Sequence, residues 1–185
     1  MKLLLQQANI LDIPADVLVC SANVMLNLTG GVGADIVARY GTEMQAELHE
    51  MLEGRTPKCA VPGEVFVCHT AGLPYLAVLH AVAVDPFYHS SPEVITATVE
   101  RAMTIAVELG AETVALTALA SGFGDLTLDD FAAGVRPLLA QEFAPIERIV
   151  IPQILDYRFR ELQEAFPEGE IVRRPPGQDA CRHGA

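Results

Sequence analysis

Residues 16–33 read DVLVCSANVMLNLTGGVG, an apolar run that passes into a glycine-rich turn. The short, continuous apolar run at 16–22 predicts a strand that is buried on both faces. The glycines that follow lead into a helix expected over 32–40, which ends at Gly41. A buried strand that runs through glycines into a helix is typical of α/β proteins.

The same alternation of strands and helices continues along the chain. Further strands are expected at 2–7, 64–69, 75–83, 114–119 and 147–151. Further helices are expected after Thr42, after Ser91, after Thr127 and over 155–166. This order predicts an α/β fold with a largely parallel sheet and helices on both faces. Ligands of such sheets bind beyond the carboxyl ends of the strands.

Several side chains carry more local expectations. Thr42 and Thr127 each begin a segment that matches a helix capping box. Pro137 is expected to kink or end the helix that Thr127 begins. Asp35 lies four residues before Arg39, a spacing that favours an ion pair on a helix. His80 lies in the middle of an apolar strand and is expected to be buried and hydrogen-bonded rather than catalytic.

The composition excludes several classes of protein. The chain has 185 residues, a formal charge of −12 and 51% apolar side chains, which argues against intrinsic disorder and against binding of extended nucleic acid. No apolar run approaches the roughly 18 residues of a membrane helix, and no secretory signal peptide is indicated. The four cysteines are widely spaced and no zinc-binding spacing occurs. We therefore expect a cytoplasmic protein with no metal ion and no cofactor.

A second glycine-rich turn, ASGFGD at 120–125, also follows an expected strand and precedes a helix. Glycines let the backbone approach a ligand closely, and free N–H groups at a helix N-terminus bind anions. Neither turn is a standard nucleotide motif, because no phosphate-binding lysine is present and the first turn lacks the third glycine of G-x-G-x-x-G. Two such loops favour a pyrophosphate held by backbone N–H groups, with purely structural turns as the alternative.

Five short motifs, taken in order, resemble those of the macro domain family, a module that binds ADP-ribose. They are VCSAN at 19–23, LNLTGGVG at 26–33, PGEV at 62–65, LHAV at 79–82 and ASGFG at 120–124. The resemblance covers about residues 8–160. It implies a three-layer α/β/α, macro-domain-like fold with a mixed, largely parallel central sheet. We expect a single such domain over 1–174 and a disordered tail over 175–185, which has no periodicity.

The resemblance also implies a site for ADP-ribose or for the terminal ADP-ribosyl group of a modified protein. Asn9 and Ile10 lie where the family contacts adenine, and Asn23 lies where it contacts the distal ribose. The two glycine-rich loops are expected to clamp this ribose and the diphosphate, and Phe123 either covers the ligand or packs in the core. The ligand-binding residues implied in this way are Asn9, Ile10, Ala22, Asn23, Gly30, Gly31, Val32, Ser121, Gly122, Phe123 and Gly124.

Departures from the family's pattern leave the ligand and the activity open. Asn9 replaces an Asp, Cys20 an Asn and Thr29 a Gly, so a different nucleotide is an alternative ligand. One hydrolytic subclass carries an Asp at the position of Gly33, and the nearest acid here is two residues later. Hydrolysis of an ADP-ribosyl bond or of O-acetyl-ADP-ribose, with a water assisted by the substrate, is the alternative to simple binding. The candidate catalytic residues are Asn23 and Asp35.

Overall fold

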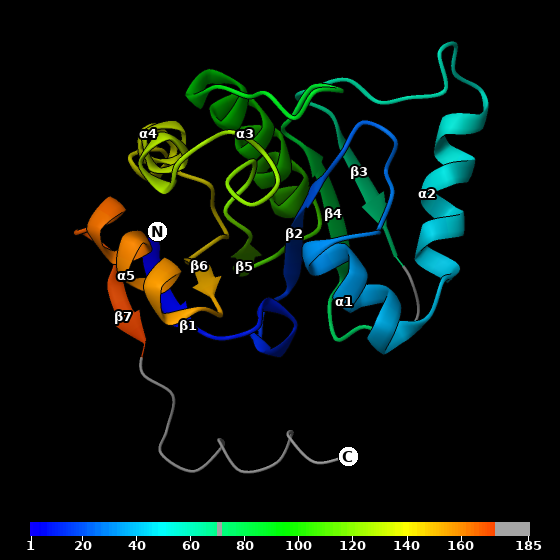
Figure 1. The fold of residues 1–185 in the computed structure, drawn as a ribbon. Helices are drawn as coiled ribbons and strands as arrows, with labels where there is room; N and C mark the ends of the chain where they lie inside the picture. The colour runs from blue at the N-terminus through cyan, green and yellow to red at the C-terminus, as the bar shows by residue number, and fades with distance from the viewer. Residues whose placement is uncertain (70–71, 173–185) are drawn as a thin grey trace, which may run out of the picture.

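The computed structural model describes residues 1–69 and 72–172. Within them, seven strands form one sheet in the order β3-β4-β2-β5-β6-β1-β7 (Figure 1). Neighbouring strands are parallel except β3 and β4, which are antiparallel. The strands are β1 (Lys2–Gln7), β2 (Val17–Ala22), β3 (Val65–Cys68), β4 (Ala77–Val82), β5 (Thr113–Leu116), β6 (Arg148–Gln153) and β7 (Glu170–Val172). The mixed, largely parallel sheet expected from the sequence is confirmed.

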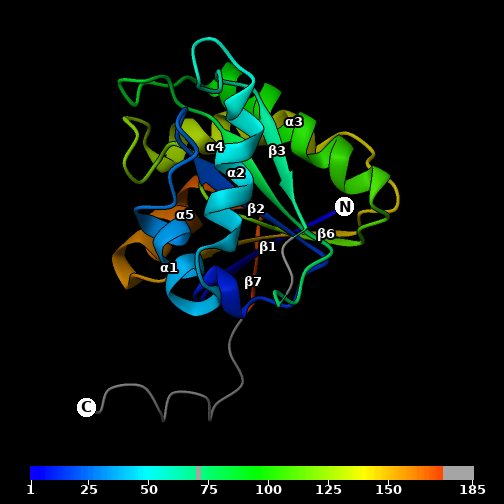
Figure 2. The ribbon, with the colours of Figure 1, turned by 90° about the vertical axis from the view of Figure 1, so that its right-hand side faces the viewer.

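Helices cover both faces of this sheet, as Figures 1 and 2 show. Two helices pack on one face and three on the other, and a short 3-10 helix follows β1. The two helices are α1 (Gly31–Tyr40) and α2 (Glu43–Glu53). The three helices are α3 (Pro92–Glu108), α4 (Leu128–Leu139) and α5 (Asp156–Ala165), and the 3-10 helix is η1 (Ile10–Asp12). This is a three-layer α/β/α architecture.

Each face of the sheet has its own apolar core, because the central strands bury side chains on both sides. In β2, Val17 and Val19 pack towards α3 and α4, whereas Leu18 and Cys20 pack towards α1 and α2. All four are at most 1% exposed. The continuous apolar run in the sequence therefore reflects a strand with no solvent-facing side.

Most helix ends follow the local signals, with two exceptions. At α4, Thr127 and Asp130 form the expected capping box, with each side chain bonded to the other's backbone N–H. Thr42 makes no side-chain capping bond at α2, so the capping box expected there was wrong. Pro137 was expected to kink or end this helix, but it does not end α4, which continues to Leu139. The carbonyl group that Pro137 leaves without a donor belongs to the exposed Ala133, where water can bond it.

The sequence reading also missed β7, a three-residue edge strand that pairs in parallel with β1. Three residues are too few for an alternation of apolar and polar side chains to distinguish a strand from an irregular segment. The tail expected at 175–185 lies outside the described residues. No helix in the described part of the chain is long and apolar enough to cross a membrane.

Candidate functional site

A cavity of about 740 Å³ lies at the carboxyl ends of four neighbouring strands, β2, β5, β6 and β1. These strands are mutually parallel, so the segments that follow them leave the sheet at the same edge. The first glycine-rich loop follows β2 and the second follows β5, and these two strands are direct neighbours. Sheet order therefore brings together two loops that lie about 90 residues apart in the sequence.

The first loop ends at the N-terminus of α1. Gly30 is the N-cap residue, and no side chain caps the helix. The backbone N–H groups of Gly31, Val32 and Gly33 donate to no acceptor within the described part of the chain. Unpaired N–H groups at the positive end of a helix dipole favour the approach of an anion. Gly31 adopts a φ of 53°, which a residue with a side chain rarely tolerates.

Two side-chain amides, one from α2 and one from the loop itself, hold the first loop in place. The Gln45 amide of α2 donates to the carbonyl of Leu26 (2.9 Å) and accepts from the N–H of Leu28 (2.6 Å). The Asn23 amide oxygen accepts from the N–H groups of Met25 and Asn27 (3.0 and 3.3 Å), and its nitrogen donates to the Asn27 carbonyl (3.1 Å). Asn23 lines the cavity, but its amide oxygen is engaged within the loop, which leaves one N–H for a ligand.

The second loop presents another run of unpaired N–H groups. Those of Gly122, Phe123 and Gly124 donate to no acceptor in the described residues. The turn is tight at its base, where Ala120 has a φ of 58°. A Cβ on Gly124 would lie 2.3 Å from the Ala120 carbonyl oxygen, so only glycine fits. Ser121 is used internally, since its hydroxyl donates to the Ala118 carbonyl (2.8 Å).

Phe123 connects the two loops. Its side chain is 74% exposed, so it is not a core residue. A Cβ built on Gly30 would lie 2.8 Å from Cε2 of the Phe123 ring, which shows that the ring rests on the backbone of the first loop. A side chain at position 30 would therefore displace the Phe123 ring, whereas the backbone angles of Gly30 are extended and open to any residue.

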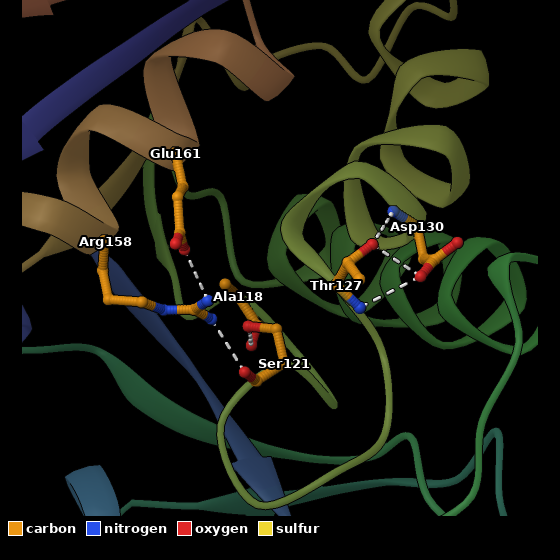
Figure 3. A network of polar contacts seen from close by, with 6 residues as sticks. All are labelled: Ala118, Ser121, Thr127, Asp130, Arg158 and Glu161. Atoms are coloured by element: carbon orange, nitrogen blue, oxygen red, sulfur yellow. Dashed lines mark hydrogen bonds and ion pairs between the residues drawn. The ribbon is translucent and has the colours of Figure 1, made fainter.

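The charges around the cavity are unlike those of the rest of the molecule. The chain carries 24 acidic residues, yet no Asp or Glu is among the described residues that line the cavity. Arg158 of α5 is the one lining cation among them. Its guanidinium donates to the Ser121 carbonyl (2.8 Å) and pairs with Glu161 (2.7 Å), as Figure 3 shows. The cavity favours an anion by backbone dipoles and by the absence of carboxylates.

The family model of the macro domain matches residues 19–134. The chain belongs to the macro domain family. An uncharacterised protein of Mycobacterium tuberculosis is 30% identical over 94% of the chain, which spans about half (47%) of that relative's length. Two solved macrodomains share the fold. An Oceanobacillus iheyensis macrodomain mutant with ADPR has a TM-score of 0.76 at 17% identity, and the alignment covers 89% of this chain and 91% of the O. iheyensis chain. A Trypanosoma brucei macrodomain in complex with ADP-ribose has a TM-score of 0.71 at 18% identity, and the alignment covers 86% of this chain and 67% of the T. brucei chain.

In this macro domain, the position expected to contact adenine is occupied by a side chain with protein partners. Asn9 caps η1 by accepting from the N–H of Leu11 (2.9 Å), and its amide nitrogen donates to the carboxylate of Asp35 (3.1 Å). Asn9 and Ile10 line the cavity, whereas Asp35 is not among the lining residues.

The expected pair between Asp35 and Arg39 was wrong, because Arg39 pairs with Asp12 (2.7 Å). This contact raises the pKa of Arg39.

Two other departures from the family pattern also have physical reasons. A Cβ on Gly33 would lie 2.9 Å from Cα of Leu28, so this macro domain has no room for an Asp there. Cys20 packs in the core between the sheet and the helices α1 and α2, and burial raises the pKa of its thiol. The thiol therefore stays neutral and does not act as a nucleophile.

The segment that follows β6 contributes a wall of the cavity that sequence reasoning missed. Ile154, Leu155, Tyr157 and Arg158 line it, together with Tyr88 and Thr117 from other loops. Thr117 ends β5 early, because its hydroxyl accepts from the N–H of Ser21 (3.0 Å). The only signal for Arg158 in the sequence was its positive charge in a chain with few cations.

Among the described residues, no three His, Cys, Asp or Glu side chains gather as a metal site.

Proposed function

We propose that this macro domain binds ADP-ribose, either free or as the terminal ADP-ribosyl group of a modified protein. One observation carries the proposal: within the described residues, two runs of three unpaired backbone N–H groups, at Gly31–Gly33 and Gly122–Gly124, line one cavity that has no carboxylate. A diphosphate offers acceptors to both runs. A lysine would not be needed, because the backbone supplies the donors.

The rest of the cavity suits the two ends of such a ligand. Its volume of about 740 Å³ is in the range of nucleotide-sized pockets. Apolar side chains of Ile10, Ile154 and Leu155 provide surface for a flat base beyond the diphosphate. We assign the distal ribose to the side of Asn23, whose amide keeps one free N–H. The O. iheyensis and T. brucei structures with ADPR or ADP-ribose support this choice of ligand.

We assign binding rather than hydrolysis to the site. Asn23 is engaged within its own loop, and Asp35 bonds Asn9 outside the cavity lining. Neither is placed to activate a water as a general base. We propose a cytoplasmic location as well, which the free cysteines at 20, 59 and 68 support.

The proposal is tested by isothermal titration calorimetry with ADP-ribose, with AMP and ADP as comparison ligands. Gly31→Glu places a carboxylate at the N-terminus of α1, where the diphosphate would bind. Gly110→Glu is the matched control, because both glycines are exposed, have a positive φ and leave space for a side chain, but Gly110 ends α3 away from the cavity.

We expect saturable binding of ADP-ribose to the unsubstituted chain and to Gly110→Glu. Binding should fall below detection in Gly31→Glu. Equal binding by both variants would contradict the assignment of the diphosphate to the first loop. An absence of binding by the unsubstituted chain up to millimolar ADP-ribose would overturn the proposed function.

A further inference from the structure

Arg158 and the second glycine-rich loop are joined by a hydrogen bond from a side chain of α5 to the loop backbone. The side chain lies on the first turn of α5, is 24% exposed and reaches across to the loop (Figure 3). Nη2 donates to the carbonyl oxygen of Ser121 (2.8 Å), and Nη1 donates to a carboxylate oxygen of Glu161 (2.7 Å). Both terminal nitrogens of the guanidinium therefore already have protein acceptors.

This contact decides the direction of the next N–H group. The C=O of Ser121 and the N–H of Gly122 belong to one peptide plane and point in opposite directions when the bond is trans. A carbonyl held towards α5 therefore turns the Gly122 N–H away from α5. Gly122 is the first of the three unpaired donors, so the orientation of this peptide plane fixes the direction of the first N–H in the run.

Little else in the loop holds that peptide plane. Gly122 has no atom within 4 Å of the position a Cβ would occupy, and glycine backbones rotate easily. Ser121 is anchored on its own side by its hydroxyl and its N–H, which both donate to the Ala118 carbonyl. On the other side of the plane, the next contacts within the described residues are those of the Phe123 ring with Gly30 and of Gly124 with Ala120, and neither is a hydrogen bond to this peptide.

We propose that Arg158 is a positioning residue that keeps the peptide between Ser121 and Gly122 in the orientation that binds the diphosphate. This inference rests on the proposed function. The alternative for a cation in this cavity is a direct ion pair with the ligand. These two bonds use two of the five guanidinium N–H groups, and the Glu161 carboxylate offsets the positive charge that a direct ion pair with the ligand would need.

The test compares Arg158→Met with Arg160→Met in the full chain. Arg160 lies on the same helix, is 72% exposed, pairs with Asp156 (2.6 Å) and does not line the cavity. Amide NMR spectra of the ligand-free proteins report on Gly122, Phe123 and Gly124, and calorimetry reports the affinity for ADP-ribose. We expect Arg158→Met to shift these three amide signals and to weaken ADP-ribose binding by about tenfold or more. Arg160→Met should change neither.

A third variant, Glu161→Gln, separates the two roles by the sign of its effect. A direct ion pair predicts stronger ADP-ribose binding, because the guanidinium loses its competing carboxylate. A positioning role predicts unchanged or weaker binding, because the guanidinium is held less firmly.

Three results would overturn the proposal: unchanged loop amides in Arg158→Met, unchanged affinity in that variant, or several-fold tighter binding in Glu161→Gln. If the unsubstituted chain bound no ADP-ribose, the proposed function would fail, whereas the amide spectra would still decide whether Arg158 orients the loop. Thermal unfolding of each variant identifies a loss of binding that comes from misfolding.

Discussion

The amide nitrogen of Asn9 donates a hydrogen bond to the carboxylate of Asp35 over 3.1 Å. The bond joins the segment after β1 to the first turns of α1, which lie 26 residues apart. The amide oxygen of Asn9 accepts from the N–H of Leu11. Asn9 therefore uses both its amide nitrogen as a donor and its amide oxygen as an acceptor, and an ionised aspartate at this position could only accept.

Asn9→Asp is expected to destabilise the protein rather than simply restore the family's residue. The new carboxylate would face that of Asp35, replacing a hydrogen bond with a repulsion, at a cost of about 2 kcal/mol. Urea unfolding at pH 7 measures this loss, and Gln7→Glu is the control because Gln7 is an exposed amide nearby. The double variant Asn9→Asp, Asp35→Asn should recover most of the loss, because it restores a donor opposite the carboxylate. Independent, additive effects would show that the two side chains do not interact.

Gly33→Ala is expected to cost about 1–3 kcal/mol of unfolding free energy, because the new Cβ meets the backbone of Leu28. Gly54→Ala is the matched control, since Gly54 has no atom within 4 Å of its Cβ position and no positive φ. Chemical denaturation should show Gly54→Ala within about 0.5 kcal/mol of the parent chain. Equal stability of the two variants would mean that the backbone of the first loop shifts at Leu28 to accommodate the new Cβ without a loss of stability.

Gln45→Leu is expected to loosen the first loop without unfolding α2. It removes the two bonds that the amide makes with the backbone of Leu26 and Leu28, which together contribute about 1–3 kcal/mol. Amide hydrogen exchange at Leu28 should accelerate, because its N–H loses its acceptor. Gln163→Leu on α5 is the control, since Gln163 is half-buried and makes no such bond within the described residues. Unchanged exchange at Leu28 would contradict the anchoring role of Gln45.

His80 is expected to make the stability of the protein depend on pH. The ring is fully buried, Nε2 lies 3.2 Å from the Met44 sulfur, and Nδ1 is a buried atom without a partner among the described residues. The expected burial is confirmed, but only one ring nitrogen has a contact. Burial lowers the pKa of His80 from 6.5 to about 4. The unfolded chain therefore binds a proton between these two values while the folded chain does not, and stability falls as the pH drops from 6.5 towards 4.

The loss attributable to His80 between pH 7 and pH 5 is about 2 kcal/mol. Urea unfolding at the two pH values measures it, and His80→Leu should flatten the difference by that amount. His69→Gln is the control, because His69 is exposed at the end of β3. A pH difference that His80→Leu leaves unchanged would show that His80 is not the group that titrates.

Much of the fold could be predicted because the signals are local. The apolar run of β2 and the capping box of Thr127 are read within a few residues, and both are present in the structure. The predictions failed where a tertiary contact replaced a local one. Gln45 has the sequence position of a capping residue, but its amide bonds the first loop instead. Arg39 likewise pairs with Asp12 rather than with its helical neighbour.

The sequence by itself determined the α/β architecture, the two glycine-rich loops and their place at the ends of strands. Periodicity, glycine and capping residues act over a few residues, so these features can be read from the chain in order. Only the tertiary structure decided that the loops meet, because their contact depends on β2 and β5 being neighbours in the sheet. It also brought Arg158 to the Ser121 carbonyl and Asn9 to Asp35. Partners this far apart in the sequence are selected by packing, and no local pattern records that choice.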